Sequence, residues 1–263
     1  MTTKTEYAHG EFSWVNLGTT DPAAAKRFYG DLFGWVAEDM PAGPGMTYTM
    51  FKLRGGYVTG LYSLQEMDAR GVPPHWIPFV NVNDADEVAR KAAQAGGRVL
   101  MGPSDVLDVG RSAALHDPAG ARLAIWQARK HRGAGIVGED GAMCWNELLT
   151  PDTGAAAKFY AATFGWTAEL VDTSADNTYT IFKSGPTMIS GMLSRPARLA
   201  DVPPNWLTYF GVADCDGAAR RVGELGGTVL WPPRDIPNVG RFAVCQDGQR
   251  AVFAVATFLP PSK

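Results

Sequence analysis

The sequence FSWVNLGTTDPAAAKRFYGDLFGWVAE, residues 12–38, returns in modified form as MCWNELLTPDTGAAAKFYAATFGWTAE at residues 143–169. Matching positions lie 131 residues apart, so that Trp14 corresponds to Trp145. Further along, Val-Gly-Arg at 109–111 recurs at 239–241 with an offset of 130. Solenoid repeats have periods of about 20–50 residues, which is far shorter. The chain therefore contains two copies of one domain, and positions that differ between the copies are where their tasks can differ.

The bulk composition narrows the class of protein. The 263 residues are 46% hydrophobic and 19% charged, which suits two globular domains that each bury a core. The net charge of −3, without a basic stripe, argues against nucleic acid or an anionic membrane as partner. No secretion signal or membrane-spanning run is apparent, and the three cysteines lack CxxC spacing. We therefore expect a cytoplasmic protein with free thiols.

Each copy divides into two similar modules. In the first copy Asp21-Pro22 opens a helix over Ala23–Leu32, because Asp is a good cap and Pro suits the first helical position. A second helix is expected over Asp84–Ala95. Strands are predicted at Phe12–Gly18, Thr47–Leu53, Tyr57–Tyr62, His75–Val82, Arg98–Met101, Gly110–His116 and Arg122–Gln127. The polar, Gly-rich segment 130–141 is predicted to link domains 1–129 and 142–263.

The arrangement resembles the vicinal oxygen chelate superfamily, which includes glyoxalase I, bleomycin-resistance proteins and extradiol dioxygenases. The resemblance lies in the helix motif Asp21–Trp35, which recurs at Asp152–Trp166, and in Asp117–Ala121 before a final strand. It covers nearly the whole chain. The segments Asp108–Ala121 and Asn238–Ala243 further resemble a two-domain bacterial branch labelled hydroxylase-like or glyoxalase-like. The resemblance implies an α+β fold of tandem glyoxalase-like domains, each built from two βαβββ modules that form a curled mixed sheet. It does not by itself imply a function, because this scaffold serves isomerases, lyases, dioxygenases and binding proteins.

Catalytic relatives hold a metal ion with His, Gln or Glu from the first and last strands of their modules. In this sequence the corresponding positions are Trp14, Ile77, Ala124, Trp145, Leu207 and Ala254. None of these side chains offers the N, O or S donors that a divalent ion needs. We therefore predict neither a metal of the family type nor another cofactor.

Alternation along the strands predicts what faces the inside of each curled sheet. The inward set includes Phe12, Trp14, Asn16 and, in the second copy, Met143, Trp145, Glu147. An aromatic and apolar cup suits a planar organic ligand. The predicted ligand-binding residues are Trp14, Asn16, Tyr48, His75, Phe79, Trp126, Trp145, Tyr179 and Tyr209.

Structural roles compete with these assignments. Trp35, Trp76 and their second copies are expected in the core, and Trp14 and Trp145 would then only plug an old metal site. Glu147 is a candidate general acid or base, although it can instead pair with an arginine. Arg111 and Arg241 are expected in structural ion pairs. Cys144, whose parity is opposite to that of Trp145, is expected to point to the helix layer as a buried thiol.

Three functions remain open at this point. The first is metal-independent binding of a small hydrophobic or aromatic metabolite, in resistance by sequestration or in secondary metabolism, and a homodimer is possible. The second is an enzyme, hydroxylase- or lyase-like, that uses Glu147 without the usual metal. The third is a scaffold for protein contacts, in which both cups are filled by their own side chains.

Overall fold

The computed structural model describes residues 4–67, 71–172 and 178–259. Each half of the chain repeats the order strand, helix, three strands twice, and a short 3₁₀ helix adds to the second half. The helices are α1 (Pro22–Phe33), α2 (Ala85–Gln94), α3 (Thr153–Phe164) and α4 (Cys215–Glu224). The strands are β1 (Phe12–Thr19), β2 (Val36–Gly43), β3 (Met46–Leu53), β4 (Gly56–Ser63), β5 (His75–Asn81), β6 (Arg98–Val106), β7 (Gly110–His116), β8 (Arg122–Ala128), β9 (Met143–Thr150), β10 (Thr167–Asp172), β11 (Thr178–Ser184), β12 (Thr187–Ser194), β13 (Asn205–Gly211), β14 (Thr228–Ile236), β15 (Gly240–Gln246) and β16 (Val252–Phe258).

The strands form two eight-stranded mixed sheets, one in each copy. Their orders are β2-β3-β4-β1-β5-β8-β7-β6 and β10-β11-β12-β9-β13-β16-β15-β14. In both sheets the first strands of the two modules pair antiparallel at the centre, β1 with β5 and β9 with β13. The modules therefore pair within each copy. The α+β prediction of tandem glyoxalase-like domains is confirmed, whereas the strand prediction, made for the first copy, missed β2, which directly follows α1.

Local sequence signals place the helices. The carboxylate of Asp21 accepts a hydrogen bond from Ala24 N at 2.9 Å, and Asp152 caps α3 in the same way at 2.8 Å. Both helices end at a glycine in the left-handed conformation, Gly34 at φ 73° and Gly165 at φ 74°. The duplicated Asp and Phe-Gly-Trp motifs therefore fix the ends of both helices.

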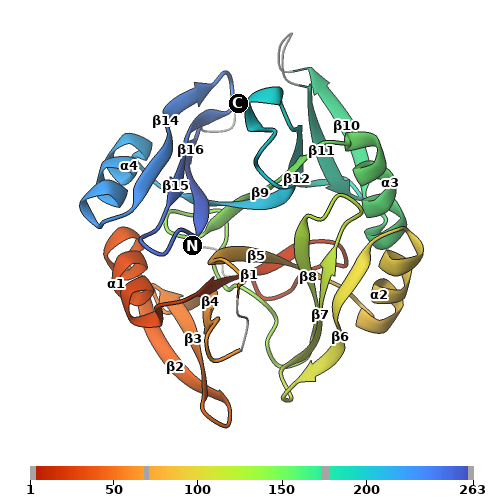
Figure 1. The fold of residues 1–263 in the computed structure, drawn as a ribbon, viewed down its shortest axis with the longest axis horizontal. Coiled ribbons are helices and arrows are strands. Elements are labelled where there is room, and N and C mark those ends of the chain that lie inside the picture. The colour runs from red at the N-terminus through yellow and green to blue at the C-terminus, as the bar shows by residue number, and fades with distance from the viewer. Residues whose placement is uncertain (1–3, 68–70, 173–177, 260–263) are drawn as a thin grey trace.

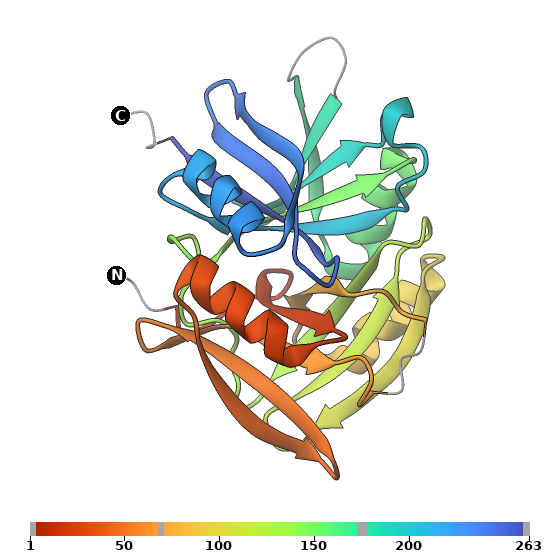
Figure 2. The ribbon, with the colours of Figure 1, turned by 60° about the vertical axis from the view of Figure 1, so that its left-hand side comes forward.

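The backs of the two sheets pack together, with α1 beside α4 on one side and α2 beside α3 on the other (Figure 1; Figure 2). The buried layer between the sheets is aromatic and contains Trp35, Trp76, Trp166 and Trp206, as predicted for structural tryptophans. It is crossed by matched hydrogen bonds, from Tyr29 to Asp247 at 2.9 Å and from Tyr160 to Asp117 at 3.0 Å. The concave faces of the sheets consequently point away from each other. We call them the first cup, on the β1–β8 sheet, and the second cup, on the β9–β16 sheet.

No helix of the described residues is long and apolar enough to cross a membrane.

Candidate functional site in the two cups

Strand register assembles equivalent rows of side chains in both cups. Trp14 lies opposite Phe79, which lies opposite Ala124, and the equivalent row holds Trp145, Tyr209 and Ala254. The next row joins Asn16 to Ile77 and Gly60, and its equivalent joins Glu147 to Leu207 and Gly191. The floors of the cups thus share a plan and differ in chemistry.

A β-bulge at the start of each central strand corrects part of the predicted inward set. The register shifts between Phe12 and Trp14 in β1, and between Tyr209 and Phe210 in β13 opposite the start of β9. A bulge places one extra residue in a strand and so reverses the alternation beyond it. Phe12 and Met143 therefore lie in the core between the domains. Cys144 packs instead with the second-cup side chains, and the prediction that it faces the helix layer is wrong.

Trp14, Asn16 and Tyr48 form a closed polar network on the floor of the first cup. Asn16 Oδ1 accepts hydrogen bonds from Trp14 Nε1 at 2.7 Å and from the Tyr48 hydroxyl at 2.6 Å. The Tyr48 ring reaches this position because Gly60 lies beneath it. A Cβ added at Gly60 would lie 1.9 Å from the Tyr48 hydroxyl oxygen. The polar side-chain groups of these three predicted ligand-binding residues thus form hydrogen bonds with one another.

A segment that follows β8 crosses the first cup and covers Trp14. We call residues 131–136 the strap. The His131 ring stands edge-on to Trp14 at 4.6 Å between centroids, and the Trp126 indole donates to His131 O at 2.9 Å. Burial lowers the pKa of His131 to about 4, so its imidazole is neutral near pH 7. Under this cover Trp14 is only 3% exposed, so the first cup is largely filled by its own chain.

His75 lies in a separate network at the far end of β5. Its Nδ1 faces Pro73 O at 2.8 Å, and its Nε2 faces the Tyr62 hydroxyl at 3.0 Å. Pro73 O can only accept, so Nδ1 carries the proton and Nε2 accepts from Tyr62. Burial lowers the pKa of His75, which favours this neutral form.

The second cup contains a carboxylate among aromatic rings. Glu147 Oε1 accepts from the Tyr209 hydroxyl at 3.1 Å, and the Trp145 indole donates to the Tyr179 hydroxyl at 3.0 Å. Burial raises the pKa of Glu147 above its ordinary value, although hydrogen bonds from Tyr179 and Tyr209 and the charge of Arg234 act in the opposite direction. Trp145, Glu147 and Tyr179 are half-buried residues, whereas Tyr209 is buried. The structure thus brings three predicted ligand-binding residues together around the predicted acid.

The wall of the second cup contains residues that the sequence reasoning missed. Phe242 lies 6.1 Å from Tyr209 between ring centroids, and Arg234 covers Phe242 at 5.1 Å and Trp231 at 4.4 Å. In the first copy the equivalents of Trp231, Arg234 and Phe242 are Met101, Ser104 and Ser112. Comparison of the copies at an offset of 130 would have found this difference. Ala256 also stands where the first cup has the much larger Trp126.

The residues of neither cup fit a divalent metal ion. The six predicted ligand positions carry indole, aliphatic or methyl groups, and the tyrosine hydroxyls lie over Gly60 and Gly191. Within residues 4–67, 71–172 and 178–259, no three His, Cys, Asp or Glu side chains gather as a metal site would require. Glu147 alone, with phenol partners, is not a ligand set for such an ion.

Both copies match one family model, described as Glyoxalase/Bleomycin resistance protein/Dioxygenase superfamily, over residues 11–125 and 143–254. The chain belongs to this superfamily. Its sheets agree with solved structures of the superfamily, although those are distant in sequence. The Mn(II)-bound glyoxalase from Novosphingobium aromaticivorans has a TM-score of 0.64 at 17% identity, covering 95% of this chain and 82% of that one. The 2,3-dioxygenase LapB from Pseudomonas sp. KL28 has a TM-score of 0.63 at 12% identity, covering 97% and 96%.

Two curated relatives within the superfamily are similar over nearly their full lengths. "Putative glyoxylase CFP32" from Mycobacterium tuberculosis is 40% identical over 256 residues, covering 97% of both chains. "Anthracycline biosynthesis protein DnrV" from Streptomyces peucetius is 36% identical over 263 residues, covering 95% of this chain and 94% of the relative. The similarity to each relative thus spans both domains of this superfamily member.

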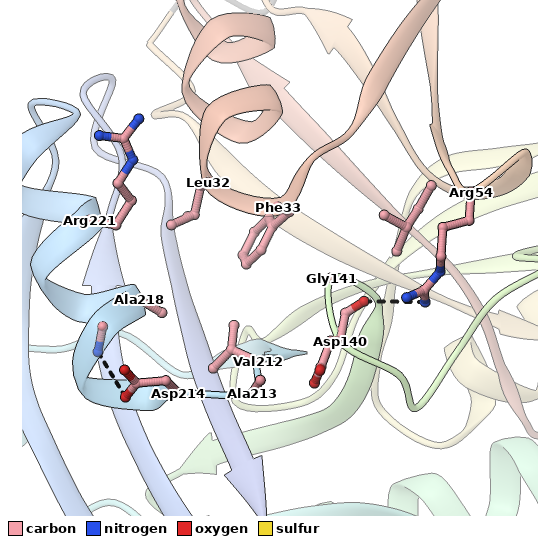
Figure 3. Close-up of a pocket in the computed structure, with 12 residues that line it drawn as sticks. Leu32, Phe33, Arg54, Asp140, Gly141, Val212, Ala213, Asp214, Ala218 and Arg221 are labelled. Carbon is pink, nitrogen blue, oxygen red and sulfur yellow. Dashed lines mark hydrogen bonds between the residues drawn. The ribbon is translucent and has the colours of Figure 1, made fainter. Parts of the chain in front are cut away.

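A hollow of about 440 Å³ also lies between α1 and the start of α4 (Figure 3). Gly217 and Ala218 of α4 line it, where α2 has the larger Glu87 and Val88. Two of its polar groups already have partners: Arg54 pairs with Glu139 at 2.7 Å, and Asp214 caps α4. We therefore place the candidate site of this superfamily member in the second cup, where the unusual chemistry lies.

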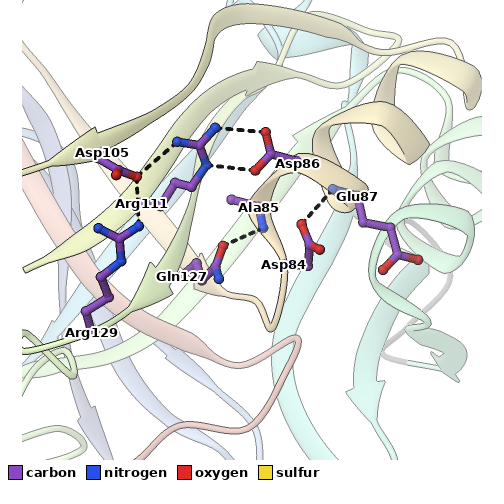
Figure 4. Close-up of polar contacts among 8 residues, drawn as sticks. All are labelled: Asp84, Ala85, Asp86, Glu87, Asp105, Arg111, Gln127 and Arg129. Atoms are coloured by element: carbon purple, nitrogen blue, oxygen red, sulfur yellow. Dashed lines mark hydrogen bonds and ion pairs between the residues drawn. The ribbon is translucent and has the colours of Figure 1, made fainter.

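Arg111 and Arg241 form the ion pairs expected for them, and Figure 4 shows those of Arg111. Arg111 holds both carboxylate oxygens of Asp86, at 2.7 and 2.8 Å, and Asp105 at 2.9 Å. Arg241 holds Asp216 in the same bidentate way, at 2.6 and 3.0 Å. Neither arginine pairs with Glu147, whose described partners are tyrosines.

Proposed function

We propose that the second cup binds a small, planar, aromatic metabolite without a metal ion. The observation that carries this proposal is the contrast between the cups. The first is covered by the strap and Trp126, whereas the second has Ala256 and partly exposed Trp145, Tyr179 and Phe242. A planar ring stacked on these side chains would bury apolar surface on both of its faces.

The anthracycline-related relative supports this choice of ligand class. Anthracyclines contain planar fused rings, and a protein of their biosynthesis is 36% identical to this chain. We infer from this similarity a role in secondary metabolism, as a binding or accessory protein. Glu147 would accept a hydrogen bond from a ring hydroxyl, and Arg234 would cover the outer edge of the ring.

The test is a titration of chelator-treated protein with 1,4-dihydroxyanthraquinone, followed by tryptophan fluorescence. We expect saturable quenching, and we expect Ala256→Trp, which copies the first cup, to weaken binding by at least about tenfold by filling the space. The matched control is Trp126→Ala, which changes the first cup and should leave the affinity of the second unchanged. Absence of quenching, or binding that returns only when a divalent metal is added, would contradict the proposal.

A second function, metal-independent acid–base catalysis by Glu147, is favoured by one specific observation. Burial raises the pKa of the Glu147 carboxyl group, which brings it nearer to the range of a general acid or base. Two tyrosine hydroxyls are positioned to stabilise its charged form. The discriminating variant is Glu147→Gln, which should abolish turnover of a substrate while the affinity for it persists. Equal product formation by the variant would rule out this role.

A further inference from the structure

A groove of about 210 Å³ opens beside the second cup. Its walls come from Met143–Asn146 of β9, from Thr187–Ile189 of β12, and from the approaching segments that contain Lys4, Tyr7 and Val137. We call it the side groove. Trp145 lines the side groove and also belongs to the floor of the second cup. The side groove and the second cup therefore share this indole.

The equivalent place in the first domain is filled by the strap. Ala134 N donates to Ser13 O at 2.8 Å, and Gly135 N donates to Tyr57 O at 2.8 Å. Ala134 is fully buried against Trp14, and the ring of His131 stands on the same indole. The strap thus does two things. The His131 ring packs on Trp14, and the Ala134 and Gly135 amides donate hydrogen bonds to β1 and β4.

The duplication puts the same two acceptors in the side groove. Ser13 corresponds to Cys144, and Tyr57 corresponds to Met188. Ser13 and Cys144 are both bulge residues, so their carbonyl groups are not held by the regular ladder. Among the described residues, no loop or turn N–H donates to the carbonyl of Cys144 or of Met188. The strap of the first domain therefore indicates what the side groove of the second domain can bind, namely a segment with two hydrogen-bond donors.

We propose that the side groove is a subsite of the second cup, and that it takes a ligand arm with two neighbouring hydrogen-bond donors, arranged like the Ala134 and Gly135 amides of the strap. The arm extends from the ring that the cup holds, so this inference rests on the proposed function. The donors bind Cys144 O and Met188 O. Lys4 and Glu11 neutralise each other at 2.9 Å at the far wall, so the arm needs no charge. The ligand class is thus narrowed to an aromatic compound with an amide- or amine-bearing side chain.

The probe is a synthetic copy of the strap, acetyl-His-Arg-Gly-Ala-Gly amide, which corresponds to residues 131–135. The comparison peptide is methylated on the nitrogens that correspond to Ala134 N and Gly135 N, which removes both donors. With methyl-labelled methionine, the resonance of Met188, 61% exposed at the side groove, reports occupancy. We expect a saturable shift in the millimolar range and roughly tenfold weaker binding of the methylated peptide. No shift of Met188, or equal binding of both peptides, would overturn the proposal.

Thr187→Trp supplies the second measurement, because Thr187 is exposed at the side groove and the new ring would block it. The expected result is loss of peptide binding with unchanged affinity for 1,4-dihydroxyanthraquinone, and Thr187→Ser serves as the matched control. Peptide binding that survives in Thr187→Trp would also overturn the subsite. If the anthraquinone fails to bind wild-type protein, the proposed function fails by itself, and the peptide still decides whether the side groove accepts donors.

Discussion

The two cups have the same floor plan and different contents. In the first cup, Trp14 and Tyr48 donate hydrogen bonds to the neutral side chain of Asn16, and the strap covers Trp14. In the second, the equivalent of Asn16 is Glu147, which keeps a raised pKa among partly exposed aromatic groups. The comparison teaches that the strap covers the floor of the first cup, while the floor tryptophan and the acid of the second cup stay half-buried.

Outside the cups, the two copies share matched contacts in the core between the domains. These contacts serve as the control when the two cups are compared. Trp35 donates to Gly141 O at 2.7 Å, and Trp166 donates to Gly10 O at 2.9 Å. Each tryptophan thus anchors the segment that leads into the other domain. Differences in ligand binding can therefore be traced to the cups and not to the core between them.

The largest expected effect tests this shared core. Trp35→Ala and Trp166→Ala should each lower the free energy of unfolding by roughly 3–5 kcal/mol, because both remove a buried indole. Trp145→Ala should cost less than about 2 kcal/mol, since that ring is partly exposed. Denaturant unfolding measures all three. A Trp145 variant as unstable as the other two would mean that this ring is a structural plug.

The next prediction loosens the strap. Gly133 has φ 120°, and a Cβ there would lie 2.6 Å from Ser13 O, so Gly133→Ala should cost roughly 1–3 kcal/mol of local stability. Hydrogen exchange of the Ala134 and Gly135 amides should accelerate. Gly138→Ala is the control, because Gly138 also has positive φ, at 70°, but open space around its Cα. Equal exchange in the two variants would show that crowding against Ser13 does not hold the strap.

A smaller effect concerns pH. Because burial raises the pKa of Glu147 in the folded state, the folded protein keeps this proton longer than the unfolded chain does. Its contribution to stability should therefore fall as pH rises from about 4.5, the ordinary value, through the folded pKa. Glu147→Gln should remove this part of the slope. Burial also raises the pKa values of Asp117 and Asp247. These two groups contribute the same pH dependence to the wild-type protein and to Glu147→Gln. Identical slopes would contradict the prediction.

The smallest effect is expected at the matched arginines. Arg111→Lys and Arg241→Lys each lose a bidentate pair at an exposed site, where ion pairs contribute little. Thermal unfolding should show a slight change that is equal in the two variants, and ligand affinity should be unchanged. A loss of ligand affinity in Arg241→Lys alone would show that the Arg241–Asp216 ion pair affects the second cup. It would contradict the prediction that this pair and the ligand site are independent.

The sequence by itself determined the duplication, the four modules, the helix ends and the absence of metal donors at the family positions. Those properties depend on local signals: an Asp cap, a Gly with positive φ, or the chemistry of a single side chain. It also singled out Glu147, which stands where the first copy has Asn16, and Trp145, which stands at a metal-ligand position of the resembled family.

Only the tertiary structure decided which cup is covered. The bulges beside Phe12 and Met143 depend on strand pairing across the sheet, and they moved Cys144 from its predicted side to the cup. The strap was predicted as a linker because its Gly-rich composition carries no periodic signal. Its position follows from two hydrogen bonds to residues far away in the sequence, Ser13 and Tyr57. Such contacts form when the sheet closes, so local sequence patterns do not encode them.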